Sequence, residues 1–256
     1  MKTRRARLLP VAASVLALGL VSACGGSGSG DGNTSGDAKN DKVSSAPTKE
    51  SAAPDEDSQA APAKALSEGE LNKAALATAD VSGFTVKTPS KEEVSGAGEE
   101  KAKSPECQPI ASVIGGVPQP EPNGLVYRQL LSTSEDEDAG GLILFEMLAA
   151  YEQRSAERML GDLRKAMKAC SGGFSTTSAG ETNRYTTVRE LTAPTGADDA
   201  LAYEVVGDLE GDKVPLLFNV VRSGSTVAIF YSMNLMDSSK AEVPKAVVTA
   251  QINKLK

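Results

Sequence analysis

Residues 25–65 contain almost nothing that could enter a hydrophobic core, and this restricts where the chain can fold. They hold one bulky aliphatic residue, Val43, and no aromatic residue. Such a segment cannot bury enough apolar surface to offset the entropy lost on ordering. We therefore expect residues 24–65 to be a disordered tether with a root-mean-square span of about 35 Å. Folding is then confined to residues 66–256, which we expect to form a single domain.

The first 23 residues have the layout of a secretory signal peptide. Four basic residues precede an apolar run: Lys2, Arg4, Arg5 and Arg7, then residues 8–20. The run is shorter than the roughly 20 residues that a membrane-spanning helix needs. We expect residues 1–23 to be removed on export. The general export route fits best, and the arginine pair leaves the twin-arginine route open.

The junction Val21-Ser22-Ala23-Cys24 resembles a bacterial lipobox. The resemblance implies that the signal is removed just before Cys24 and that this residue carries acyl chains such as palmitate. It also implies a lipoprotein held on the cell membrane by those chains and facing outside the cytoplasm. A cleaved signal followed by an unlipidated cysteine is the alternative.

The charge of the chain argues against two classes of partner. The formal net charge is −7, and removing the signal takes away basic residues only. Nucleic acids and anionic lipid surfaces are bound through basic surfaces. We therefore expect no nucleic-acid partner, and we expect the acyl chains on Cys24 to attach the protein to the membrane without help from a polybasic patch.

Two cysteines remain once Cys24 is assigned to the anchor. Cys107 and Cys170 would lie in a compartment where disulfides persist, so one bridge between them is the simplest outcome. The closed loop of about 64 residues would be worth up to about 4 kcal/mol. Two buried free thiols are the alternative. A zinc site is not expected, because the chain has no histidine and too few thiols.

Residue periodicity predicts an α+β fold, an antiparallel sheet of about five to six strands with helices packed on it. Ser67 and Glu70 form a capping-box signature for a helix running toward Asp80. Helices are also predicted after Cys107, over residues 152–170 and from about Pro244. Extended stretches are predicted over residues 84–86, 125–131, 141–149, 185–191, 201–206, 214–222 and 226–233. Residues 89–105 are predicted to form a long surface loop.

The last two strands predict a hairpin with a two-residue loop at Ser223-Gly224. That loop pairs one set of apolar residues on the core face: Phe218 with Ile229, Val220 with Val227, and Leu216 with Tyr231. The opposite face carries Leu217, Asn219, Thr226 and Phe230. Apolar and polar side chains mixed in this way predict an interaction surface if the C-terminal helix covers only the other face. The alternative is that the helix over residues 152–170 packs there.

Three features together resemble secreted actinobacterial lipoprotein domains and the extracellular sensor domain of the mycobacterial kinase PknH. They are the run of residues 76–84 after a short helix, the pair Cys107 and Cys170 with the second at the end of a long amphipathic helix, and the final hairpin followed by a helix. The resemblance implies an α+β sheet domain with a groove and a ligand-sensing role. No kinase domain lies in this chain, so sensing would need a separate partner.

The residues predict no catalytic site, no metal site and no cofactor. Without histidine, the Ser-His-Asp, Cys-His and His-metal arrangements are excluded. The acidic runs at residues 135–138 and 208–212 are better explained as solvated loops than as cation sites. We expect a non-catalytic domain that binds a small ligand or an envelope protein through residues that the sequence does not identify. The alternative is a histidine-free cell-envelope hydrolase that uses paired carboxylates or a Ser-Lys pair.

Overall fold

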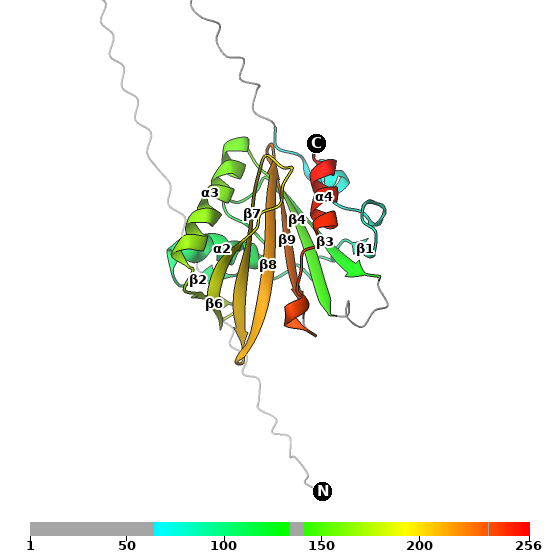
Figure 1. Ribbon diagram of the computed structural model, residues 1–256. Coiled ribbons are helices and arrows are strands. Elements are labelled where there is room, and N and C mark those ends of the chain that lie inside the picture. Colours follow the sequence, from blue (N-terminus) through cyan, green and yellow to red (C-terminus); the bar gives the residue numbers. More distant parts are fainter. Residues whose placement is uncertain (1–63, 134–140, 235) are drawn as a thin grey trace, which may run out of the picture. The chain divides into compact units, whose positions relative to one another are not determined.

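The computed structural model describes residues 64–133, 141–234 and 236–256, and this part of the chain forms one twisted antiparallel sheet with helices on both faces (Figure 1). The sheet has nine strands in the order β1-β3-β4-β9-β8-β7-β6-β5-β2. The strands are β1 Phe84–Lys87, β2 Lys101–Ala102, β3 Gly124–Ser132, β4 Leu142–Ala150, β5 Phe174–Ser178, β6 Glu181–Leu191, β7 Asp199–Leu209, β8 Asp212–Ser223 and β9 Thr226–Asn234. The α-helices are α1 Glu68–Ala74, α2 Gln108–Ile114, α3 Gln153–Ala169 and α4 Lys245–Lys254. Short 3₁₀ turns cover Thr78–Asp80, Pro105–Cys107 and Ser238–Lys240.

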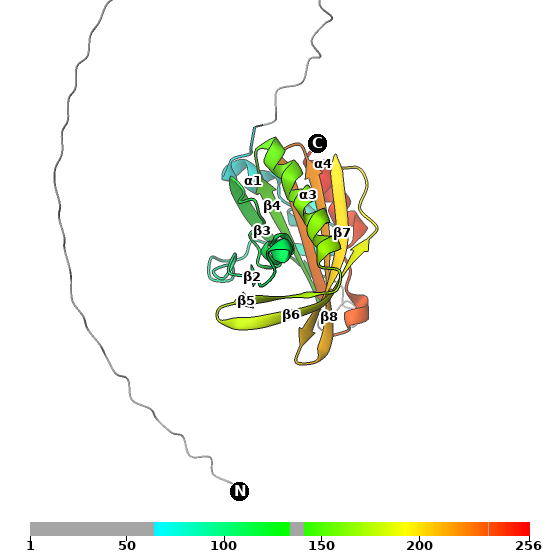
Figure 2. The same cartoon turned by 90° about the vertical axis from the view of Figure 1, so that its left-hand side faces the viewer.

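The two faces of the sheet carry separate hydrophobic cores, because side chains alternate along each strand. On β9, Val227 and Ile229 join the core under α2 and α3. Ala228 and Phe230, from the same strand, join the core under α1 and α4. Figures 1 and 2 show α3 and α4 on opposite sides of the sheet. A central strand covered on both faces is expected to be apolar at successive positions, and β9 is so from Val227 to Tyr231.

The sequence pattern predicts α3 well. Met159, Leu160, Leu163 and Met167 recur on one side of this helix and are all buried against the sheet. The cysteine pair lies at disulfide distance, with the Cα atoms of Cys107 and Cys170 5.9 Å apart. Cys170 caps the end of α3, and Cys107 precedes α2. The bridge therefore joins the two helices that cover this face.

The capping box at the start of α1 is also confirmed. The backbone N–H of Glu70 donates to the Ser67 hydroxyl, and the backbone N–H of Ser67 donates to the Glu70 carboxylate at 2.8 Å. The helix ends at Ala74, earlier than predicted, and a separate 3₁₀ turn covers the stretch before Asp80. The chain becomes extended at Ala75, which places Leu76 in the core and lets its N–H donate to Glu146 on β4.

The sheet has nine strands, more than the predicted five to six. Seven of the nine lie on the predicted extended stretches, and β2 and β5 are the two that no sequence pattern predicts. β5 reads FSTTS and has no run of alternating apolar residues. It becomes a strand because its backbone pairs with β6 along its whole length. β2 lies inside the predicted 89–105 loop and has only two residues, Lys101 and Ala102, which pair with Thr177 and Thr176 of β5. Both segments are strands because neighbouring segments pair with their backbones.

The β8–β9 hairpin exists, but its predicted loop and residue pairs are wrong. The loop is Gly224-Ser225, and Ser223 pairs with Thr226. Gly224 has φ 57°, and the first loop position is where a type II′ turn needs glycine. Phe218 therefore pairs with Tyr231, and Val220 pairs with Ile229. Each partner moves by two residues, which keeps every side chain on its predicted face.

The predicted interaction surface is wrong as well. Phe230 is fully buried in the core under α1 and α4, and Thr226 is buried too. Leu217 and Asn219 are only partly exposed. The helix that covers this face is α4, whereas the 152–170 helix, α3, packs on the opposite face against Phe218 and Ile229. This face is therefore neither an exposed interaction surface nor the packing site of the 152–170 helix.

Two groups of predictions fall outside the described residues. The signal peptide, Cys24 and nearly all of the tether lie within residues 1–63, and the acidic run lies within residues 134–140. Over the ranges that are described, no helix is both long and apolar enough to cross a bilayer.

Candidate functional site

Glu146 is the carboxylate that departs most from ordinary behaviour. It lies on β4 and is fully buried under α1 and α4. The backbone N–H of Leu76 donates to its Oε2 at 3.2 Å, and its Oε1 has no partner among the described residues. Burial raises the pKa of Glu146 to about 7, and the Leu76 N–H and the charge of Arg128 offset only part of that rise. It lines neither of the two cavities described below, so it is not placed to reach a substrate.

Glu100 is a second carboxylate enclosed by the fold. It accepts hydrogen bonds from the hydroxyl of Thr176, from the amide of Asn183 at 3.1 Å and from the hydroxyl of Tyr185 at 3.1 Å. These donors come from β5 and β6 and fix the segment before β2 to the sheet. We interpret this carboxylate as a structural anchor for that edge.

The acidic stretch at residues 208–212 is a hairpin turn. The carboxylate of Asp208 accepts from the backbone N–H of Gly211 at 2.9 Å and from the ammonium of Lys213 at 2.6 Å. Its oxygens are thus occupied by protein donors, which agrees with the solvated-turn interpretation. Among the residues that the structure places, no group of three potential metal-ligating side chains occurs.

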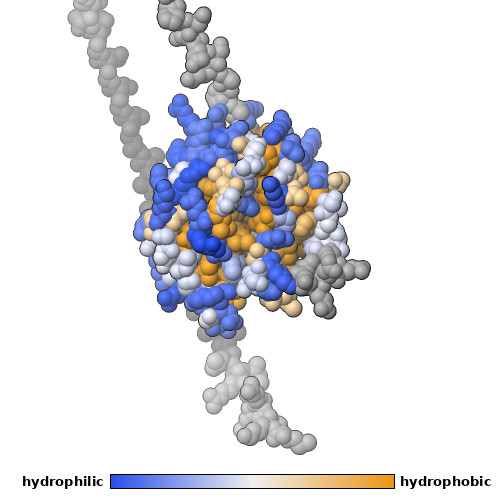
Figure 3. Space-filling model, in the orientation of Figure 1, coloured by the Kyte–Doolittle hydropathy of each residue, from blue (hydrophilic) through white to orange (hydrophobic). Residues whose placement is uncertain are grey.

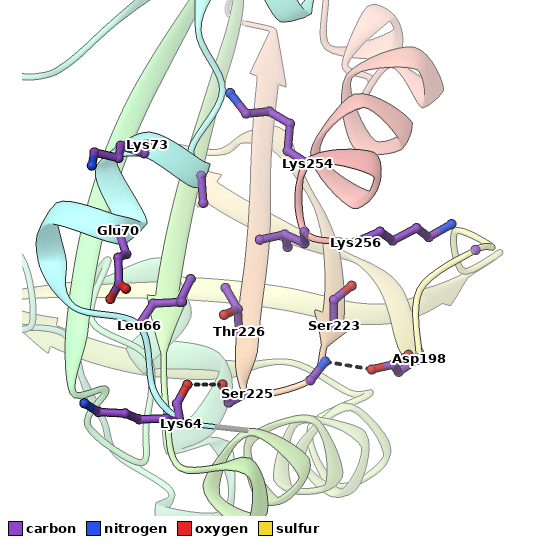
Figure 4. Close-up of a pocket in the computed structure, with 14 residues that line it drawn as sticks. Lys64, Leu66, Glu70, Lys73, Asp198, Ser223, Ser225, Thr226, Lys254 and Lys256 are labelled. Carbon is purple, nitrogen blue, oxygen red and sulfur yellow. Dashed lines mark hydrogen bonds between the residues drawn. The ribbon is translucent and has the colours of Figure 1, made fainter. Parts of the chain in front are cut away.

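A groove of about 720 Å³ lies between the start of the domain, the β8–β9 turn and the end of α4 (Figure 4). We call it the lysine groove. It is lined by Lys64, Leu66, Glu70, Lys73 and Ala74, by Gly196 and Asp198, by residues 223–226, and by Lys254, Leu255 and Lys256. Four chain segments that are distant in sequence therefore meet at this groove.

Four lysines and two carboxylates line the groove, and Asp80 pairs with one of these lysines, so the local excess is one positive charge in a chain whose net charge is −7. Lys254 is engaged, because its ammonium donates to Asp80 at 2.5 Å and to the Ala75 carbonyl at 2.9 Å. Within the described part of the chain, Lys64, Lys73 and Lys256 form no salt bridge. The pKa of Glu70 is lowered by its bonds to Ser67 and, to a smaller extent, by the charges of Lys64 and Lys73, so this carboxylate partly compensates two of these three ammonium groups.

The two carboxylates of the groove are held by donors of the fold. Glu70 accepts from the N–H and the hydroxyl of Ser67, and these bonds lower the pKa of Glu70. Asp198 accepts from the backbone N–H of Gly224 at 2.7 Å. The dashed line in Figure 4 shows this second contact at the hairpin turn. Both carboxylates accept hydrogen bonds from protein donors.

The floor of the groove is partly apolar. Figure 4 shows Leu66 and Thr226 between the lysines, with Lys64 and Lys73 on one side and Lys256 on the other. Leu66 and Leu255 are only partly buried although they pack against the core under α1 and α4. The groove therefore combines a charged rim with a small apolar floor.

A second cavity, of about 540 Å³, lies between α4 and the loop from β6 to β7. We call it the threonine cleft. It is lined by residues 192–195, Asn219, Val243, Lys245, Val248 and Thr249. Figure 3 shows the face of the molecule that is turned to the viewer in Figure 1. Apolar surface gathers near the centre of this face and is bordered by hydrophilic residues. Of the predicted surface residues, Asn219 lines this cleft and Thr226 lines the lysine groove, whereas Leu217 and Phe230 line neither.

The lysines of the groove escape sequence reasoning because they form no motif. Lys64 precedes α1 and Lys73 lies in its last turn, whereas Lys254 ends α4 and Lys256 follows it, about 180 residues later. Only the pairing of β9 between β4 and β8, with α1 and α4 above it, brings them together.

Comparison with known proteins assigns no family. No protein-family model and no curated protein matches the chain. Among solved structures, the chain is similar to the crystal structure of the extracellular domain of PknH from Mycobacterium tuberculosis, with a TM-score of 0.44 and 14% identity. The similarity covers 75% of this chain and 95% of that one. A likeness this distant gives the chain neither a family nor a function.

Proposed function

We propose that this chain is a lipid-anchored extracytoplasmic protein whose folded domain binds a ligand and catalyses no reaction. The signal-like residues 1–23 and the lipobox-like junction at Cys24 support the location. The observation that carries the binding role is the lysine groove. Three lysines without a salt-bridge partner in the described part of the chain line a cavity of about 720 Å³, within the roughly 300–1,000 Å³ of ligand sites.

The non-catalytic part of the proposal rests on the residues that chemistry would need. Hydrolysis without histidine would call on carboxylates or a Ser-Lys pair. The two enclosed carboxylates, Glu100 and Glu146, bond to the fold itself and line neither cavity. Both carboxylates of the groove accept from protein donors, and the hydroxyl of Ser225 donates to the Lys64 carbonyl. Among the described residues of the groove, no hydrogen bond joins a serine hydroxyl to a lysine ammonium, which a Ser-Lys pair would need.

Replacing Cys24 by alanine should abolish membrane attachment, because the acylated residue is lost. We expect the variant to leave the detergent phase in a phase-partition experiment and to lose incorporation of labelled palmitate. Ser27→Ala, a change of similar size three residues into the tether, should behave as the wild type. Unchanged partitioning and labelling in Cys24→Ala would show that the protein is not a lipoprotein of this kind.

The chain should hydrolyse none of a panel of peptide, ester and glycan substrates. We expect rates equal to those of buffer for the detergent-solubilised wild type. The hydrolase alternative would be established by turnover that a single Glu→Gln or Asp→Asn substitution removes while the variant keeps its melting temperature.

A further inference from the structure

We propose that the lysine groove binds a phosphorylated amphiphile, with the phosphate held by the rim lysines and a short apolar portion lying over Leu66 and Leu255. This inference deepens the proposed binding role and rests on it. It assigns a ligand class to a site for which the sequence gives no motif.

The local charge of the groove is positive although that of the chain is negative. Four lysines and two carboxylates line the groove, and Asp80 pairs with Lys254, so the local excess is one positive charge. Glu70 is held by Ser67, and Asp198 is held by the turn at Gly224. Within the described residues, an anion that enters the groove meets three ammonium groups without a salt bridge, two of which the Glu70 carboxylate partly compensates. The negative net charge of the chain argues against anionic partners in general. It does not show the local excess of positive charge in the groove.

The hydrogen-bond donors of the groove are arranged around its floor. Lys64 and Lys73 come from one segment and Lys256 from another, and in Figure 4 their ammonium groups point outward on different sides of the floor. All three side chains are exposed, and exposed side chains change rotamer within nanoseconds, so they can turn toward an anion over the floor. Lysine is a compact point charge with three donors, which suits a group that offers acceptors in several directions. A phosphate has three or more acceptor oxygens and can be approached from several sides, whereas a carboxylate presents two oxygens in one plane. The hydroxyls of Ser223 and Thr226 add neutral donors at the floor.

The floor of the groove offers apolar contacts beside the charged rim. Lys64, Lys73 and Lys256 are exposed, and exposed charges contribute little each once solvent and salt screen them. Burial of an apolar portion adds affinity that salt does not screen. Leu66, Ala74 and Leu255 supply a floor of this kind beside the charged rim. A ligand with both a phosphate and an apolar portion matches both parts of the groove.

The test uses the Cys24→Ser chain, which removes the acylated residue and leaves the groove unchanged. Binding is measured by calorimetry with dihexanoyl phosphatidic acid below its micelle concentration. The groove variant carries Lys73→Ala and Lys256→Ala, two exposed side chains. The matched control carries Lys168→Ala and Lys91→Ala, which remove the same charge at two exposed positions that line neither cavity. Thermal unfolding of both variants shows that they remain folded.

We expect the groove variant to bind phosphatidic acid at least tenfold more weakly and the control less than twofold more weakly. We also expect affinity to fall as salt rises. Equal weakening in both variants would show diffuse attraction and overturn the proposal. Inorganic phosphate binding as tightly as phosphatidic acid would overturn the amphiphile part.

Two further probes distinguish the sources of such a ligand. Vesicles of phosphatidylglycerol and vesicles of phosphatidylcholine are compared in a sedimentation assay with the same variants. Binding to phosphatidylglycerol vesicles that the groove variant loses would identify a bilayer headgroup as the source. Binding to short-chain phosphatidic acid alone would identify a free amphiphile. No binding to any of these probes would overturn the inference, while the palmitate labelling of Cys24 would still report separately on the proposed location.

Discussion

Replacing Cys170 by serine should lower the free energy of unfolding by up to about 4 kcal/mol. The bridge to Cys107 closes a loop with a sequence separation of 63 residues. A cross-link of that length removes much of the conformational freedom of the unfolded chain. Both cysteines are almost fully buried between α2 and α3, so the loss also loosens the contact between these helices. Denaturant unfolding followed by circular dichroism measures the change.

The other cysteine of the bridge, Cys107, provides the control. Cys107→Ser should cost a similar amount, and the double variant should cost little more than either single one, because the same bond is lost each time. Non-reducing peptide mapping of exported protein should recover the two cysteine peptides linked. An additive double variant, or two free thiols in the exported wild type, would contradict the bridge.

Replacing Glu146 by glutamine should stabilise the domain at alkaline pH by up to about 3 kcal/mol. The ordinary pKa of a glutamate is 4.5, and burial raises that of Glu146 to about 7 in the folded state. Between these values the unfolded chain releases this proton while the folded chain keeps it. The stability that the protonated form provides is therefore present below about pH 4.5 and is lost as the pH rises through 7.

The neighbours of Glu146 explain why its charge is not compensated. Arg128 lies close enough to lower the pKa, but its guanidinium donates to the carbonyls of Tyr127 and Asn72 at 2.8 and 3.0 Å. Lys254 is engaged with Asp80. Ionised Glu146 would thus be left in the core with one backbone donor, from Leu76.

Unfolding free energies measured at pH 5 and pH 8 test this prediction. The wild type should lose more stability over that interval than Glu146→Gln, and the curves should converge at the acidic end. Glu121→Gln, at an exposed position in a loop, should follow the wild type at both values. A Glu146→Gln variant that is less stable than the wild type at pH 8 would show that the ionised carboxylate is the favoured form.

Some of this architecture follows from local sequence alone. The spacing of Met159, Leu160 and Leu163 specifies α3, because residues three and four apart share one side of a helix wherever it packs. Ser67 and Glu70 specify the start of α1, because the capping box is completed within four residues. The strands of the final hairpin are recognised by their apolar, β-branched runs. In each case the contacts that matter lie close together along the chain.

Other features depend on partners that the sequence does not identify. β2 and β5 are strands because of the strands beside them, and Phe230 is buried because α1 and α4, from opposite ends of the folded region, meet above β9. The pairing register of the β8–β9 hairpin depends on the turn at Gly224, whose φ is positive. The amphipathic helix, the capping box and the acidic overall charge follow from the order of the residues. Which surfaces stay open, and the approach of the groove lysines to one another, depend on packing between segments that no local pattern connects.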